Sequence, residues 1–85
     1  MKPDELLQRL ARDEVRNVRF GDALRLAEAL GFQLDRVRGS HHIFLHPRIR
    51  QRLNLQEQGG DAKPYQLRQL LDLVERYDLE LENRQ

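Results

Sequence analysis

An apolar stripe near the C-terminal end is the feature that most constrains the fold of this chain. From Pro64 onward, apolar residues recur at three- and four-residue intervals over about three turns, which is the spacing of one helix face. They are Leu67, Leu70, Leu71, Val74 and Tyr77. Pro64 suits the first turn of a helix, where its missing amide hydrogen costs no bond. Because 85 residues make a single domain and no cysteine is present to form a disulfide, this helix must pack on other elements of one small core.

Two more segments have helical features. Residues 20–30 carry apolar side chains at three- and four-residue intervals, and Gly31 follows as a C-terminal stop signal. Residues 3–12 begin with a proline and two acidic residues, which the start of a helix favours, and they predict a short N-terminal helix. We expect residues 1–18 to form an accessory extension and residues 19–82 to form the main domain.

Between the last two helices, residues 32–38 alternate imperfectly with the period of two that is typical of strands, and residues 53–56 alternate with the same period. We expect three strands, with a turn at Gly39 and Ser40 between the first two. The strands are residues 32–38, 41–46 and 53–56. Residues 48–51 are expected to form a loop and residues 58–61 a flexible segment, because two successive glycines leave the backbone unrestrained. This order predicts an α+β fold. The two helices that flank the strands cover one face of a three-stranded antiparallel sheet, and the other face stays open.

Charge is unevenly distributed, although the net charge is only +1. Residues 16–52 hold eight arginines against three acidic residues, whereas residues 72–85 hold five acidic residues against two arginines. A basic centre with an acidic flank fits a face that binds a polyanion, and it equally fits a solvated arginine-rich surface. No apolar run is long enough to cross a membrane and no signal-peptide pattern opens the chain, which predicts a soluble cytoplasmic protein.

All three histidines lie within six positions, directly after Arg36 and Arg38. Histidine exchanges protons near neutral pH and arginine supplies fixed positive charge, so this cluster suits chemistry on a phosphodiester. A shared metal ion is not expected. In a strand His42 and His46 lie roughly 13 Å apart at ~3.3 Å per residue, which is too far for ligands of one zinc ion. The sequence therefore predicts neither a metal nor another cofactor.

Strand alternation separates the histidines, because successive side chains point to opposite faces. His41 lies on one face, and His42 and His46 lie on the other. If Phe44 belongs to the core, His41 points to the open face and is the favoured reactive group. If Ile43 is in the core instead, the assignment is reversed. His46, which precedes a proline, is expected to be a structural residue that hydrogen-bonds its own loop; the alternative is a second proton donor or a phosphate contact.

Leu30-Gly31-Phe32 and Arg36-Val37-Arg38-Gly39-Ser40-His41-His42-Ile43-Phe44-Leu45-His46-Pro47 resemble the signature of the HicA toxins, small RNA-cleaving halves of bacterial toxin–antitoxin pairs. Lys63-Pro64-Tyr65-Gln66-Leu67 also resembles the stretch that opens the last helix of that family. The resemblance covers residues 20 to about 79 and implies a double-stranded-RNA-binding-domain-like fold. Leu53-Asn54-Leu55-Gln56 departs from the apolar-Pro-x-His stretch of many members, so no role is transferred there.

The resemblance implies a metal-independent endoribonuclease that cleaves mRNA and is inhibited by a HicB-type antitoxin. RNA carries its own nucleophile, the 2′-hydroxyl group, so one histidine as a general base and a few cations are the minimum machinery. The catalytic histidine of the family lies in the Gly-Ser-His-His turn. His41 and His42 are therefore both candidates for the catalytic residue.

Four other residues are candidate RNA contacts. Arg36 and Arg38 flank the turn and suit phosphate groups, with a solvated pair of arginines as the alternative. Lys63 precedes the last helix, whose N-terminal amides favour anions; otherwise it is a simple surface lysine. Ser40 lacks the Asp and His partners of a nucleophile and is expected to shape the turn of this binding surface. Two other functions remain open, namely a noncatalytic RNA-binding module of the same fold and a protein-interaction domain whose basic face meets an acidic partner.

Overall fold

A computed structural model describes residues 1–82 as three helices and one antiparallel sheet with the strand order β1-β2-β3-β4. The elements follow one another as α1 (Pro3–Ala11), α2 (Phe20–Ala29), β1 (Gln33–Arg38), β2 (His41–His46), β3 (Ile49–Gln58), β4 (Asp61–Ala62) and α3 (Pro64–Tyr77). The predicted α+β class is confirmed. The predicted number of strands is wrong, since the sheet has four strands instead of three.

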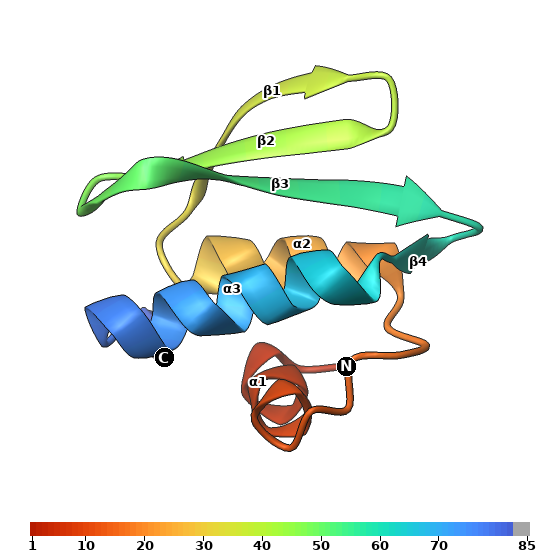
Figure 1. Cartoon of the computed structure of the whole chain (residues 1–85), viewed down its shortest axis with the longest axis horizontal. Coiled ribbons are helices and arrows are strands. Elements are labelled where there is room, and N and C mark those ends of the chain that lie inside the picture. Colours follow the sequence, from red (N-terminus) through yellow and green to blue (C-terminus); the bar gives the residue numbers. More distant parts are fainter. Residues whose placement is uncertain (83–85) are drawn as a thin grey trace.

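The elements form layers, as Figure 1 shows. Helices α2 and α3 lie side by side beneath the sheet, so that one face of the sheet is covered and the other face is open. Helix α1 packs against α2 and α3 on the side away from the sheet. None of the helices in residues 1–82 combines the length and the apolar character that crossing a bilayer requires.

Strand β3 begins earlier than expected, because residues 48–51 do not form a loop. Pro47 and Arg48 alone make the turn between β2 and β3, and His46 pairs directly with Ile49. The register then shifts before Phe44 pairs with Leu53. Such a bulge adds residues to one strand and breaks its alternation. This irregularity is the reason why the first half of β3 shows no period-two pattern in the sequence.

The segment at residues 58–61, expected to be flexible, is a tight hairpin. Gly59 and Gly60 both have positive φ angles, of 61° and 88°, which glycine adopts at little cost and which two-residue hairpin turns require. The turn returns the chain as β4, whose Ala62 amide donates to the Val18 carbonyl at 2.9 Å. The extra strand is therefore too short to show a pattern and is held by the segment that precedes α2.

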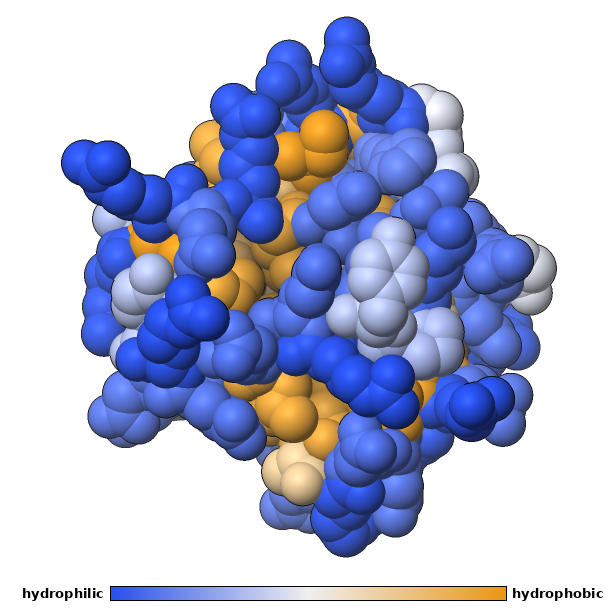
Figure 2. All heavy atoms as spheres, viewed as in Figure 1, coloured by the Kyte–Doolittle hydropathy of each residue, from blue (hydrophilic) through white to orange (hydrophobic). Residues whose placement is uncertain are grey.

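The core lies mainly between the sheet and the helices α2 and α3. Phe32 and Phe44 are its largest fully buried side chains, and leucines from both helices and from β3 surround them. These leucines are Leu26, Leu30, Leu53, Leu55, Leu67 and Leu70. On the side where β3 and α3 face the reader, Figure 2 shows a mostly hydrophilic surface with apolar atoms visible in the hollow between the sheet and the helices. The apolar stripes of the sequence thus meet in one core.

The His46 side chain forms hydrogen bonds that link the end of β2 to Leu30, the residue that caps α2. Its predicted structural role is confirmed. Its Nδ1 atom accepts the Arg48 amide hydrogen at 3.1 Å, so the other nitrogen, Nε2, carries the hydrogen and donates it to the Leu30 carbonyl at 3.1 Å. The ring also packs edge-on against Phe32. Gly31 leaves the space that this ring occupies: its φ is 96°, and a Cβ atom there would lie only 2.9 Å from His46 Nε2. Because both ring nitrogens are engaged and the side chain is buried, His46 is not a proton donor for a substrate.

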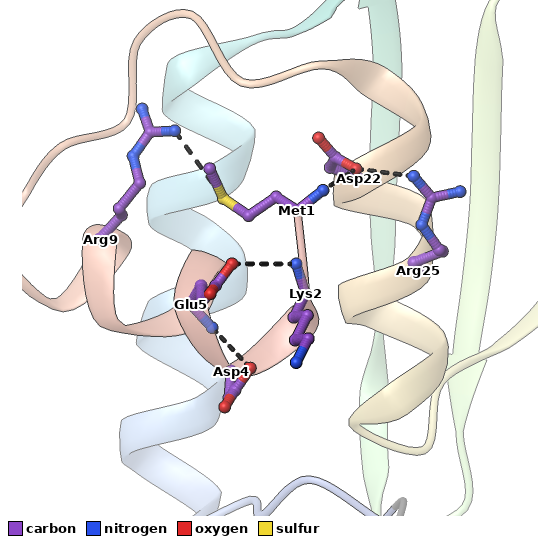
Figure 3. Close-up of polar contacts among 7 residues, drawn as sticks. All are labelled: Met1, Lys2, Asp4, Glu5, Arg9, Asp22 and Arg25. Atoms are coloured by element: carbon purple, nitrogen blue, oxygen red, sulfur yellow. Dashed lines mark hydrogen bonds and ion pairs between the residues drawn. The ribbon is translucent and has the colours of Figure 1, made fainter.

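The start of the chain is attached to α2 through a carboxylate, as Figure 3 shows. Asp22 accepts a hydrogen bond from Arg25 at 2.6 Å, and the amino group of Met1 lies 3.3 Å from the same oxygen. Arg9 of α1 lies 3.9 Å from the Met1 sulfur. The hydrogen bond from Arg25, followed by the Met1 amino group, holds the pKa of Asp22 below its usual value despite partial burial. The ionised form of Asp22 is therefore favoured in the folded state.

We expect Asp22→Asn to lower the free energy of unfolding at pH 7 by up to about 1 kcal/mol, the range of partly exposed ion pairs. Because the folded-state pKa of Asp22 is lowered, its contribution is complete above the pKa of the unfolded chain and is lost as the pH falls through the folded-state pKa. The difference between the variant and the wild type should therefore shrink in acid. Urea unfolding at pH 7 and at pH 3 measures it.

Asp72→Asn is the matched control. Both side chains of the Asp72–Arg76 ion pair are exposed, so this pair is expected to contribute less to the free energy of unfolding. A difference between Asp22→Asn and the wild type that is equally large at both pH values would contradict this account of the Asp22 carboxylate.

Candidate functional site

The pairing of β2 with its neighbours sorts the first two histidines onto opposite faces of the sheet. Phe44 is buried and lies opposite buried Leu53, so its face of β2 points to the helices. His42 shares that face, lies opposite buried Leu55 and packs edge-on against Phe20 of α2, with ring centroids 4.9 Å apart. His41 points the other way. The condition under which His41 lies on the open face, namely a buried Phe44, is therefore met.

His42 is enclosed on its helix-facing side. Its Nδ1 atom is buried and has no hydrogen-bond partner within residues 1–82. A buried nitrogen without a hydrogen-bond partner costs free energy. The contact with Phe20 makes His42 part of the packing between β2 and α2.

Arg36 and Arg38 lie on the same face as His41. Arg38 pairs directly with His41, and Arg36 pairs with Ile43, which has the same orientation as His41. A register shift between Leu34 and Arg36 places Leu34 on the helix side and both arginines on the open side. This bulge explains why the alternation along β1 looked imperfect. Arg36 makes one exposed ion pair, at 3.5 Å to Asp35, and Arg38 makes no ion pair within residues 1–82.

The His41 ring meets Asn54 of β3. The Nδ1 atom of His41 lies 3.3 Å from Asn54 Oδ1 and 3.0 Å from Asn54 Nδ2. Across the described part of the chain, the ring nitrogen Nε2 has no hydrogen-bond partner. The sequence did not single out Asn54 as a site residue. Its alternation with Leu53 and Leu55 was a signal, but the pairing that brings Asn54 beside His41 depends on a strand register that the sequence does not display.

Ser40 and Lys63 lie at the same end of the sheet as His41, where the β1–β2 turn, β4 and the start of α3 come together (Figure 1). Ser40 is exposed, and its backbone carbonyl accepts the Glu57 amide hydrogen at 3.3 Å. Lys63 is half-buried and directly precedes α3. Because the strand order is β1-β2-β3-β4, Lys63 lies across the sheet from Arg36 and Arg38, and these four residues do not form one compact cluster.

Gln66 connects the start of α3 to this end of the sheet. It is buried, and its side-chain Oε1 accepts the Gln56 backbone hydrogen at 2.6 Å. Its Nε2 donates to the Tyr65 hydroxyl at 3.3 Å. Gln56 pairs with His41 in the neighbouring strand. The first turn of α3 is thus fixed relative to the strand pair that carries His41.

The described residues form no recognisable metal centre. Within residues 1–82, no group of three or more histidine, aspartate or glutamate side chains is arranged to hold a metal ion. The open face carries the His41 imidazole in contact with the Asn54 amide, and the guanidinium groups of Arg36 and Arg38 lie on the same face. This set can exchange a proton and can attract a phosphate group.

The fold and the site together define a small α+β domain whose open, arginine-bearing sheet face carries the His41 imidazole. A family model described as the HicA toxin of bacterial toxin–antitoxin systems matches residues 20–75, from the start of α2 into α3. The chain belongs to the HicA toxin family. Membership implies a toxin component and a cognate antitoxin as its partner. No curated protein and no solved structure matches the chain in the other two comparisons.

Proposed function

We propose that this chain is a metal-independent endoribonuclease that cleaves mRNA, with His41 as the catalytic residue and a double-stranded-RNA-binding-domain-like sheet as its platform. The observation that carries the proposal is the position of His41. Its ring stands on the open face directly across from Arg38, with Nδ1 against Asn54 and Nε2 without a partner in residues 1–82. A polymer such as RNA can reach this face without entering a cavity.

The proposed reaction uses the substrate's own hydroxyl group. His41 Nε2 accepts the proton of a ribose 2′-hydroxyl, and the 2′-oxygen forms a bond to the adjacent phosphorus. The bond from phosphorus to the 5′-oxygen breaks, and the leaving oxygen takes up a proton from water or from the His41 imidazolium. The products are a 2′,3′-cyclic phosphate and a 5′-hydroxyl. Arg36 and Arg38 stabilise the negative charge on the phosphate oxygens in the transition state.

His42 is the weaker candidate for the same role. Its Nδ1 atom is buried without a partner, and its ring packs on Phe20 beneath the sheet. A substrate on the open face would have to pass through the strand to reach that nitrogen. His42 therefore supports the packing of β2 on α2 in this proposal.

The proposed RNA path crosses the end of the sheet from β1 toward α3. Arg36 and Arg38 contact phosphates beside His41, and Ser40 lies at the exposed turn next to them. Lys63 lies beyond β4, at the start of α3, where backbone amides also favour anions. This path is longer than one nucleotide, which suits a polymeric substrate.

The proposed antitoxin is of the HicB type and inhibits the toxin by covering the His41 face. Arg38 makes no ion pair within residues 1–82, so an acidic segment of the partner would complement it. The toxin and its mRNA substrate would meet in the cytoplasm.

The two histidines can be separated by substitution. We expect His41→Gln to lower the cleavage rate by about 10²- to 10⁴-fold, the usual contribution of a general base. His42→Leu, which keeps similar volume and removes the unpaired nitrogen, should keep most of the activity. The measurement is cleavage of a defined RNA in the presence of a chelator, using chain purified under denaturing conditions and refolded without antitoxin. Circular dichroism checks that each variant folds.

Wild-type rates in the His41→Gln variant would contradict the assignment of the base. Binding of RNA by the wild-type chain without any cleavage would favour the alternative, a noncatalytic RNA-binding module.

Arg38 should contribute mainly through the phosphate. We expect Arg38→Gln to weaken binding of a fully 2′-O-methylated RNA, which cannot be cleaved, and to reduce the slope of log affinity against log salt by about 1. Arg76→Gln is the control, because Arg76 lies on α3 and pairs with Asp72. Fluorescence anisotropy at several salt concentrations gives both slopes. Equal slopes for Arg38→Gln and the wild type would exclude a phosphate contact by Arg38.

A further inference from the structure

We propose that Asn54 is a positioning residue for His41: its amide holds Nδ1 of the imidazole and thereby leaves Nε2 as the nitrogen that reacts. The inference rests on the proposed function, since it concerns how His41 performs its role. The observation behind it is a contact between two side chains: both Oδ1 and Nδ2 of Asn54 lie within hydrogen-bonding distance of His41 Nδ1.

The strand register explains why this contact is possible. Asn54 pairs with Ile43, and His41 is the next residue on the same face of β2, so the two side chains are diagonal neighbours across the strand pair. Both residues are partly buried, and both sit in strands instead of loops. A bond between two strand side chains restricts rotation of the ring and fixes the direction in which Nε2 points.

The chemistry selects one of the two amide contacts for the reacting state. A neutral imidazole has one ring hydrogen, so Nε2 can accept a proton only when Nδ1 carries that hydrogen. Asn54 Oδ1, 3.3 Å from Nδ1, then accepts it. After Nε2 has taken the proton of the substrate, Nδ1 still carries its hydrogen and the same bond persists. The ring therefore needs no reorientation during proton transfer.

The contact through Asn54 Nδ2 corresponds to the other tautomer of the His41 ring. Asn54 Nδ2 lies 3.0 Å from His41 Nδ1, and donation along this line would require the ring hydrogen to be on Nε2. Rotation of the amide by half a turn exchanges its oxygen and nitrogen. A neutral amide also orients the ring without the full negative charge of a carboxylate, which would retain a proton on the imidazole. An asparagine thus suits a base that must be unprotonated before the reaction.

The first measurement is spectroscopic and needs no RNA. Long-range proton–nitrogen correlation spectra of the folded chain, recorded where the ring is neutral, show which nitrogen of His41 carries the hydrogen. His41→Gln identifies the signals by their loss. We expect hydrogen on Nδ1 in the wild type, and a mixture of both tautomers in Asn54→Leu. Hydrogen mainly on Nε2 in the wild type would overturn the proposal.

The second measurement is kinetic. We expect Asn54→Leu to lower kcat by about 10²-fold with KM unchanged, because a misdirected base affects the transition state more than binding. Asn54→Asp keeps the acceptor oxygen and should recover part of kcat. Gln8→Leu is the control, because Gln8 is an exposed residue of α1, on the side of the helices away from the sheet, and its side chain makes no hydrogen bond within residues 1–82. The control should cleave at the wild-type rate.

The outcomes distinguish this inference from the proposed function. If the wild-type chain cleaves RNA through His41 and Asn54→Leu is as fast, the positioning role is wrong and the nuclease stands. An Asn54→Asp variant as slow as Asn54→Leu even at alkaline pH, where the carboxylate no longer keeps the imidazole protonated, would also overturn the acceptor role. If the wild-type chain never cleaves RNA, or if His41→Gln is fully active, the proposed function fails and the positioning role fails with it.

Discussion

The burial of Phe44 is the constraint on which the site depends. This ring is enclosed between β2 and the helix layer, and Leu53 lies opposite it in β3. Because side chains alternate along a strand, fixing Phe44 inward fixes His42 inward and His41 outward. A slip of the strand by one residue would exchange the two histidines and bury a polar face, at a cost of several apolar contacts. Core packing thereby decides which imidazole faces the solvent.

Two buried polar side chains, His46 and Gln66, then fix the sheet relative to the helices. His46 ties the far end of β2 to the carbonyl that ends α2, and Gln66 ties the first turn of α3 to the backbone of β3. Both side chains are buried, so the loss of either bond would leave unpaired backbone groups. The open face is consequently built on strands whose positions are fixed from below. Sites on such elements are held more accurately than sites on loops.

Much of this architecture could be predicted from the sequence. The helices carry regular apolar spacing, Gly31 marks the end of α2, and β2 is bounded by the Gly39-Ser40 turn and by Pro47. The family resemblance is also confirmed over residues 20–75. The first half of β3, the strand β4 and the partner of His41 could not be predicted. A bulge removes the alternation in β3, β4 has only two residues, and the contact with Asn54 depends on a register shift that only the folded sheet reveals.

The most direct test of the central claim is a titration of the folded chain with fully 2′-O-methylated RNA, followed through the imidazole ring protons of the three histidines. The account predicts that the His41 signal shifts with increasing RNA while the His42 and His46 signals stay in place, because only His41 lies on the face that meets the nucleic acid. A shift of His42 or His46 with an unchanged His41 would contradict it.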